Sequence, residues 1–128
     1  MEKRIKINFP SYKFELVCKL NNSSIAEKIY STLPQESTTK IWGDEIYFYL
    51  PLNLSNENPT LDVKIGDVGW WPEGKCFCIF FGRTPISDSE NPKPYSEITL
   101  IGKIEITKEI VARLKSIKSN SKVILEKL

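Results

Sequence analysis

The 128-residue sequence contains no histidine, so few of its side chains could act as a catalytic acid, base or nucleophile. The absence of histidine excludes the Ser-His-Asp and Cys-His mechanisms and removes the usual proton carrier near neutral pH. Acid–base chemistry would therefore need a carboxylate, Lys, Tyr or Cys side chain. The available carboxylates and thiol are Asp44, Glu45, Asp67 and Cys78, and no spacing singles out a pair among them.

The cysteines do not form a metal-binding pattern. Cys18 stands alone, whereas Cys76 and Cys78 are two residues apart, so their side chains would share one face of a strand. With no histidine and no second cysteine pair, a structural zinc site lacks ligands. We therefore expect no metal and no cofactor, and we interpret the three cysteines as small buried apolar residues.

A tyrosine pair is the next candidate for function. Residues 45–50 alternate, with Ile46, Phe48 and Leu50 on one face of a predicted strand and Glu45, Tyr47 and Tyr49 on the other. The first face is typical of a core. Two tyrosines on the outer face of a sheet have two interpretations. They form either a binding surface or an ordinary solvent-exposed sheet surface.

Composition and charge limit the class of partner. The net charge of +2 comes from 18 basic and 16 acidic residues, which argues against nucleic acid as a partner. No apolar run is long enough to span a membrane. Residues 1–10 lack the apolar region and cleavage site of a signal peptide, so we expect a cytoplasmic location. The length predicts a single domain over residues 1–128.

The densest apolar stretch, residues 66–82, predicts a central hairpin. Trp70 and Trp71 end one strand, and Pro72-Glu73-Gly74 has the composition of a turn. Residues 75–81 then form a second strand. Because this run is apolar without polar alternation, we expect it to be buried on both faces.

The remaining elements predict a mainly β fold. Helices are expected at residues 24–33, with Ser24 and Glu27 as a capping box and Pro34 as its end, and at residues 108–118, capped by Thr107. Alternation predicts further strands at residues 4–9, 12–20 and 121–128. Strands are also expected at residues 37–42, 60–65 and 97–104. The expected fold is a closed antiparallel barrel of about eight strands with a helix over each open end.

The order and spacing of these segments resemble cyclophilins. GDEIYFYLPL (43–52), DVGWWPEGKCFCIFFGRTP (67–85) and IGKI (101–104) are similar to the small prokaryotic cyclophilin-like family. That family is related to the cyclophilin-like domains of bacterial allophanate-hydrolase-like and oxoprolinase-type proteins. The resemblance covers nearly the whole chain and implies a cyclophilin-like barrel.

The resemblance also implies where this chain departs from peptidyl-prolyl cis–trans isomerases. Those enzymes hold proline in an apolar pocket and aim an Arg guanidinium at the prolyl amide. The matching segment, residues 38–42, has Lys40 as its only cation, and lysine does not replace the planar guanidinium. The pocket histidine is absent, and Tyr47 or Tyr49 takes the place of a glutamine. Arg83, just beyond the central strand, is a candidate guanidinium from another direction or a solvated loop residue.

Three functions remain open. In the first, Trp42, Tyr47, Tyr49, Cys78 and Phe80 form an aromatic groove that binds a proline-containing peptide segment or a small ligand. In the second, the protein is a weak or atypical peptidyl-prolyl isomerase. In the third, it is a subunit of a hydrolase or lactam-cleaving complex. The irregular segment 83–95 is long enough to have a functional role over this groove.

Overall fold

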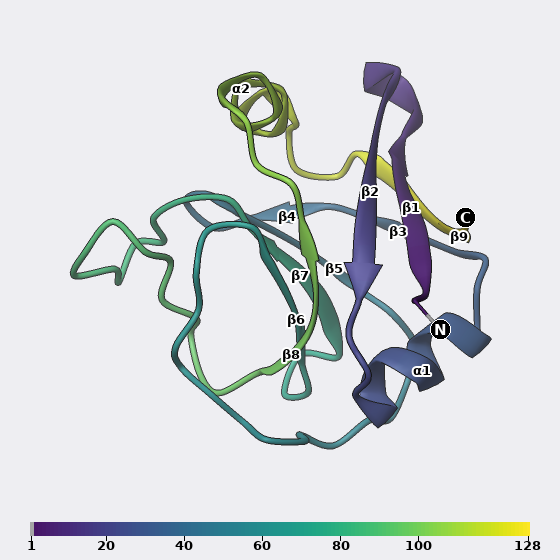
Figure 1. Cartoon of the computed structure of the whole chain (residues 1–128). Helices are drawn as coiled ribbons and strands as arrows, with labels where there is room; N and C mark the ends of the chain where they lie inside the picture. The colour runs from purple at the N-terminus through teal and green to yellow at the C-terminus, as the bar shows by residue number, and fades with distance from the viewer. Residues whose placement is uncertain (1) are drawn as a thin grey trace.

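A computed structural model describes residues 2–128 of the protein. One nine-stranded antiparallel sheet has the order β3-β9-β1-β2-β8-β6-β7-β5-β4 and curls into a nearly closed barrel (Figure 1). The strands are β1 (Arg4–Phe9), β2 (Phe14–Leu20), β3 (Gln35–Thr38), β4 (Lys40–Ile41), β5 (Glu45–Tyr49), β6 (Asp67–Trp71), β7 (Cys76–Phe80), β8 (Thr99–Ile104) and β9 (Lys122–Lys127). The predicted mainly β barrel is confirmed, with one strand more than expected.

The two ends of the sheet meet in one stretch of chain. β3 pairs with β9, whereas β4, one residue further on, pairs with β5. Thr39 lies between them, and the Ser37 hydroxyl donates a hydrogen bond of 2.6 Å to the Tyr49 carbonyl oxygen. The segment therefore passes from one edge of the sheet to the other and brings the two edges together, which nearly closes the barrel.

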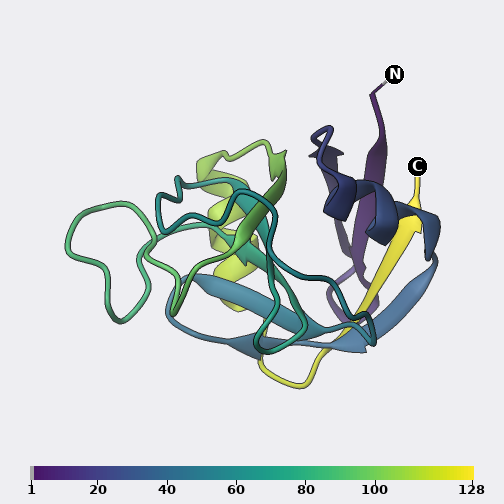
Figure 2. The same cartoon turned by 90° about the horizontal axis from the view of Figure 1, so that it is seen from below.

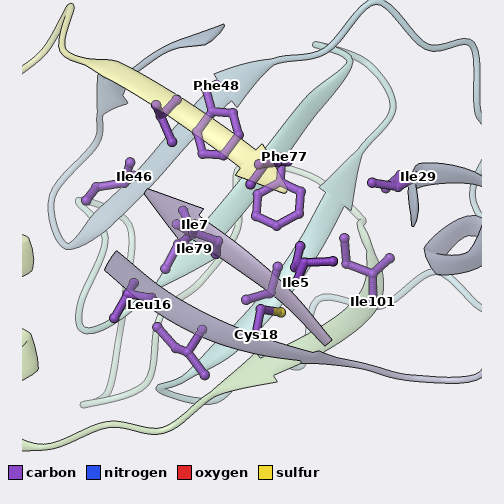
Figure 3. Close-up of a cluster of buried hydrophobic side chains, with 14 of the residues drawn as sticks. Ile5, Ile7, Leu16, Cys18, Ile29, Ile46, Phe48, Phe77, Ile79 and Ile101 are labelled. Atoms are coloured by element: carbon purple, nitrogen blue, oxygen red, sulfur yellow. The ribbon is translucent and has the colours of Figure 1, made fainter. Parts of the chain in front are cut away.

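The interior of the barrel is filled by one face of each strand. In Figure 3 the rings of Phe48 and Phe77 lie side by side, with centroids 5.1 Å apart and planes 22° from parallel. Ile46 and Ile79 belong to the same cluster, and all four side chains are fully buried. The predicted alternation is confirmed: β5 and β7 direct their odd and even residues to opposite faces.

The helices lie at opposite ends of the barrel, and each is amphipathic (Figures 1 and 2). α1 (Ser24–Ser31) buries Ile25, Ala26 and Ile29, and α2 (Lys108–Ser116) buries Leu114. Thr107 caps α2 as predicted, since its side chain accepts a hydrogen bond from Ile110 N.

The predicted capping box of α1 is wrong by one residue. Ser23 is the N-cap, and its hydroxyl accepts a hydrogen bond of 3.1 Å from Ala26 N. Ser24 instead donates to the Glu57 carboxylate, which also accepts from Ile25 N at 3.2 Å. A carboxylate from a distant loop thus binds the helix start, where unpaired N–H groups favour negative charge.

The predicted strand at residues 60–65 is also wrong, because only Thr60 forms a bridge, to Ile98. The following residues use their hydrogen-bonding groups locally. Lys64 N donates to the Asp67 carboxylate at 2.8 Å, and Asp67 N donates back to Lys64 O at 3.0 Å. Such side chain–backbone turns compete with strand pairing. No helix in residues 2–128 is long and apolar enough to cross a membrane.

The contact between β2 and β8 requires glycine at position 102. A Cβ there would lie 2.6 Å from Lys19 O and 2.9 Å from Cys18 Sγ. We expect Gly102→Ala to lower the free energy of unfolding by about 1–3 kcal/mol, because the two strands must separate. Urea unfolding measures this, with Lys103→Ala on the exposed neighbouring residue as the control. An unchanged midpoint for Gly102→Ala would contradict the close approach.

Candidate functional site

A pocket of about 130 Å³ opens on the outer face of β5 and β7, opposite the barrel core. Its size is close to that of a cavity of about 150 Å³ that holds benzene. We call it the aromatic pocket. It is lined by Trp42, Glu45, Tyr47, Trp71, Cys78, Phe80, Pro94, Tyr95 and Ile98.

The turn between β4 and β5 places an aromatic ring and a carboxyl group together. Trp42 and Glu45 exchange backbone hydrogen bonds of 3.0 and 3.2 Å across Gly43-Asp44. Gly43 has φ +61°, and a Cβ at this position would lie 2.8 Å from Arg83 O. Asp44 N also donates to Arg83 O at 2.8 Å, so the turn is held against the chain that leaves β7.

Five aromatic residues line the pocket, and the rings of four of them contact one another in sequence. Tyr95 meets Trp42 and Trp71 edge to face, with centroids 6.2 and 5.9 Å away and planes at 74° and 75°. Tyr47 meets Trp71 at 6.4 Å and 90°. Edge-to-face packing is one of the favoured arrangements of aromatic pairs, so these contacts hold the four side chains in place along the pocket.

The segment between β7 and β8 supplies Pro94 and Tyr95 to the pocket. Much of this segment projects from one side of the barrel as a green loop in both views (Figures 1 and 2). The Ser87 hydroxyl accepts hydrogen bonds from Thr84 N at 2.9 Å and Lys93 N at 3.1 Å, which closes the loop on itself. At its end, Trp71 Nε1 donates to Ser96 Oγ at 2.7 Å. The loop is therefore fastened beside the pocket.

Glu45 is the one charged residue that lines the pocket among residues 2–128. Only 6% of Glu45 is exposed. Burial raises the pKa of its carboxyl from 4.5 to about 7, and a hydrogen bond with the Cys78 thiol offsets part of this effect. Near neutral pH, the group is thus balanced between its neutral and charged forms.

The thiols beside Glu45 stay protonated. Burial, with a smaller contribution from Glu45, raises the pKa of Cys76 to about 11 and that of Cys78 well above its usual range. All three cysteines are buried, as the sequence predicted. Within residues 2–128, no group of three or more His, Cys, Asp or Glu residues could hold a metal ion.

Comparison with known proteins identifies the fold family. A family model described as Cyclophilin-like matches residues 3–126. The chain belongs to the Cyclophilin-like family. It is similar to the hypothetical protein AF2241 from Archaeoglobus fulgidus, whose solution structure shares 35% identity and a TM-score of 0.81. That match covers 99% of this chain and 95% of the archaeal one. No curated protein matches the chain.

Four of the predicted groove residues of this cyclophilin-like protein line the aromatic pocket: Trp42, Tyr47, Cys78 and Phe80. Tyr49 lies outside it and is 52% exposed. Of the two candidate cations, Lys40 is exposed opposite Tyr47, and the Arg83 guanidinium donates to Ser87 O at 3.2 Å within the loop. Neither lines the pocket.

Sequence reasoning did not assign Trp71, Pro94, Tyr95 and Ile98 to this site. Trp70 and Trp71 are adjacent, so one must face the core and the other must face outward, and the sequence did not indicate which. In the structure Trp70 is fully buried and Trp71 lines the pocket. Strand alternation placed Glu45 on the same face as Tyr47 and Tyr49, but no spacing singled it out from Asp44, Asp67 and Cys78 as a site residue.

Proposed function

We propose that this cyclophilin-like protein is a binding module whose aromatic pocket holds a compact, ring-sized group of a peptide segment or small ligand. One observation carries this proposal: the walls are aromatic or apolar, and a single buried carboxyl, Glu45, is the charged group among them. Pockets of this kind bind through apolar burial, and a few polar groups set orientation. We propose that it acts as one domain over residues 1–128, in the cytoplasm, without nucleic acid or membrane.

The placement of charges favours binding over catalysis. Stabilising a twisted prolyl amide needs a guanidinium at the site, whereas Arg83 is engaged with Ser87 O in the loop. A hydrolytic role would need a thiolate or a second carboxylate beside Glu45. Burial keeps the Cys78 thiol protonated, and the Asp67 carboxylate accepts a hydrogen bond from Lys64 N at 2.8 Å instead.

The three tryptophans provide an internal control for a binding test. In ¹H–¹⁵N NMR titrations with N-acetyl-Ala-Pro-amide and with cyclopentanol, we expect the indole signals of Trp42 and Trp71 to shift. The Trp70 indole should not shift, because it is buried and donates to Leu54 O at 3.0 Å in the core. Tyr47→Ala should weaken binding at least about tenfold, whereas Tyr49→Ala, outside the pocket, should leave it unchanged. Unmoved Trp42 and Trp71 signals with both probes would contradict the proposal.

Isomerase activity is tested separately by exchange NMR on the same Ala-Pro peptide. We expect no acceleration of cis–trans exchange by the wild type at micromolar concentration, and the same result for Arg83→Ala and Lys40→Ala. Acceleration that disappears in Arg83→Ala would overturn the binding-only proposal. It would make the protein an isomerase with its guanidinium on the other side of the groove.

A further inference from the structure

The negative charge of the Glu45 carboxylate has no positively charged partner among the residues that line the aromatic pocket. Glu45 is 6% exposed, and neither lysine nor arginine is among the pocket residues within 2–128. Two effects shift the pKa of the Glu45 carboxyl: burial and a hydrogen bond with the Cys78 thiol. Neither involves a positively charged group. A buried carboxylate without a positive partner is costly, and it is stabilised when a cation enters beside it.

The walls of the pocket favour a cation as well. Tyr47, Trp71, Tyr95 and Trp42 follow one another at interplanar angles of 90°, 75° and 74°. The negative face of an aromatic ring attracts a cation, and tryptophan does so most strongly. Pockets lined by several aromatic rings bind alkylated ammonium groups, whose charge is spread over methyl groups that also prefer an apolar site.

We propose, building on the binding function above, that the aromatic pocket recognises an alkylammonium group, with the Glu45 carboxylate as its counter-ion. A trimethylammonium group has fewer heavy atoms than benzene, so it suits a pocket of about 130 Å³. The ligand is a small free amine or an alkylated lysine side chain of a peptide. Both present the same chemistry to the four rings and to Glu45.

Among the ionisable groups around the pocket, Glu45 is the one that we expect to change its charge near neutral pH. Burial raises the pKa of Tyr47 on its own strand and of Cys76 and Cys78 on β7, and the charge of Glu45 contributes to each shift. The neighbouring Asp44 pairs with Lys115 of α2 at 3.8 Å, and neither residue lines the pocket. Lys40 on β4 lies exposed outside the pocket, and Tyr95 completes the wall from the loop. Binding of a permanent cation should therefore strengthen between pH 6 and pH 8 as Glu45 loses its proton.

The test compares two probes of equal shape and different charge. Choline and its neutral carbon analogue 3,3-dimethylbutan-1-ol are titrated into the 128-residue protein at pH 8, with the Trp42 and Trp71 indole signals as the readout. We expect choline to bind at least about tenfold more tightly than the alcohol. Glu45→Gln should remove most of this difference by weakening choline alone, whereas Glu36→Gln, an exposed carboxylate on β3, should change neither affinity.

The outcomes separate this inference from the binding function on which it rests. Equal affinity for choline and the alcohol would overturn the cation proposal and leave an apolar binding pocket. Failure of both probes, together with the Ala-Pro peptide, would remove the binding function itself. Retention of the choline preference in Glu45→Gln would also overturn the assignment, because the counter-ion would lie elsewhere.

A second arm distinguishes the two sources of the cation. N-acetyl-trimethyllysine methylamide is compared with choline under the same conditions. A tighter affinity for the lysine derivative would support a peptide as the natural ligand, since its backbone would contact the surface around the pocket. Equal affinities would support a free amine. In both cases the ammonium group enters the aromatic pocket as proposed.

Discussion

Phe77→Ala is expected to destabilise the protein by about 3–5 kcal/mol, a large share of the stability of a domain of this size. Phe77 is fully buried and stacks on Phe48 at 5.1 Å between ring centroids. It lies at the centre of the barrel, where β5 and β7 pair through Phe48 and Phe77 directly. Removing its ring leaves a cavity that the strands around it cannot close without breaking the sheet pairing.

The loss should extend to the aromatic pocket. Cys78, the next residue of β7, faces the pocket, so the same strand supports both faces of the sheet. Urea unfolding, followed by tryptophan fluorescence, gives the free energy for the whole molecule. The control is Tyr49→Ala, which removes a ring of similar size that is 52% exposed and should cost less than about 1 kcal/mol. Similar losses for the two variants would contradict the assignment of faces.

The division of β5 and β7 into two faces could be predicted because strand alternation is a local property with a period of two residues. Phe48 and Phe77 belong to the core for this reason, and Tyr47 and Cys78 belong to the other side. The strand predicted at residues 60–65 is absent because Lys64 and Asp67 form a turn through their backbone groups and the Asp67 carboxylate. The local sequence pattern does not show whether a segment will pair as a strand or form a turn stabilised by side chain–backbone hydrogen bonds.

The candidate site was harder to predict because its parts come from distant segments. Tyr95 follows a long irregular loop, and its contact with Trp42 depends on how that loop folds back, which no local pattern determines. The carboxylate that binds the start of α1 shows the same limitation, since Glu57 lies on a loop far along the chain from Ser24. Glu45 was visible as an acidic residue, but in the structure it is buried in a pocket that residues of β7 and of the loop also line.

Glu45→Gln is expected to stabilise the protein at pH 8 by about 3 kcal/mol and to leave its stability at pH 4 nearly unchanged. Burial raises the pKa of the Glu45 carboxyl from 4.5 to about 7 in the folded protein. The unfolded chain has the ordinary value, so the folded state binds the extra proton between these two pH values. Stability therefore falls as pH rises through this window and levels off above about pH 7. Each tenfold change in proton affinity corresponds to about 1.4 kcal/mol, which gives the expected size.

The glutamine variant keeps the shape of Glu45 but carries no charge, so it should lack this part of the pH dependence. Urea unfolding of both proteins at steps between pH 4 and pH 8 gives the difference curve, in which the titration of all other groups cancels. Glu36→Gln is the matched control, because that carboxylate is exposed and pairs with Lys122 at 3.6 Å. A flat difference between wild type and Glu45→Gln would mean that the carboxyl is already solvated or paired in the folded protein. The alkylammonium proposal would then lose the unbalanced charge on which it depends, whereas a falling curve that choline reverses at pH 8 would connect the stability of the fold to its ligand.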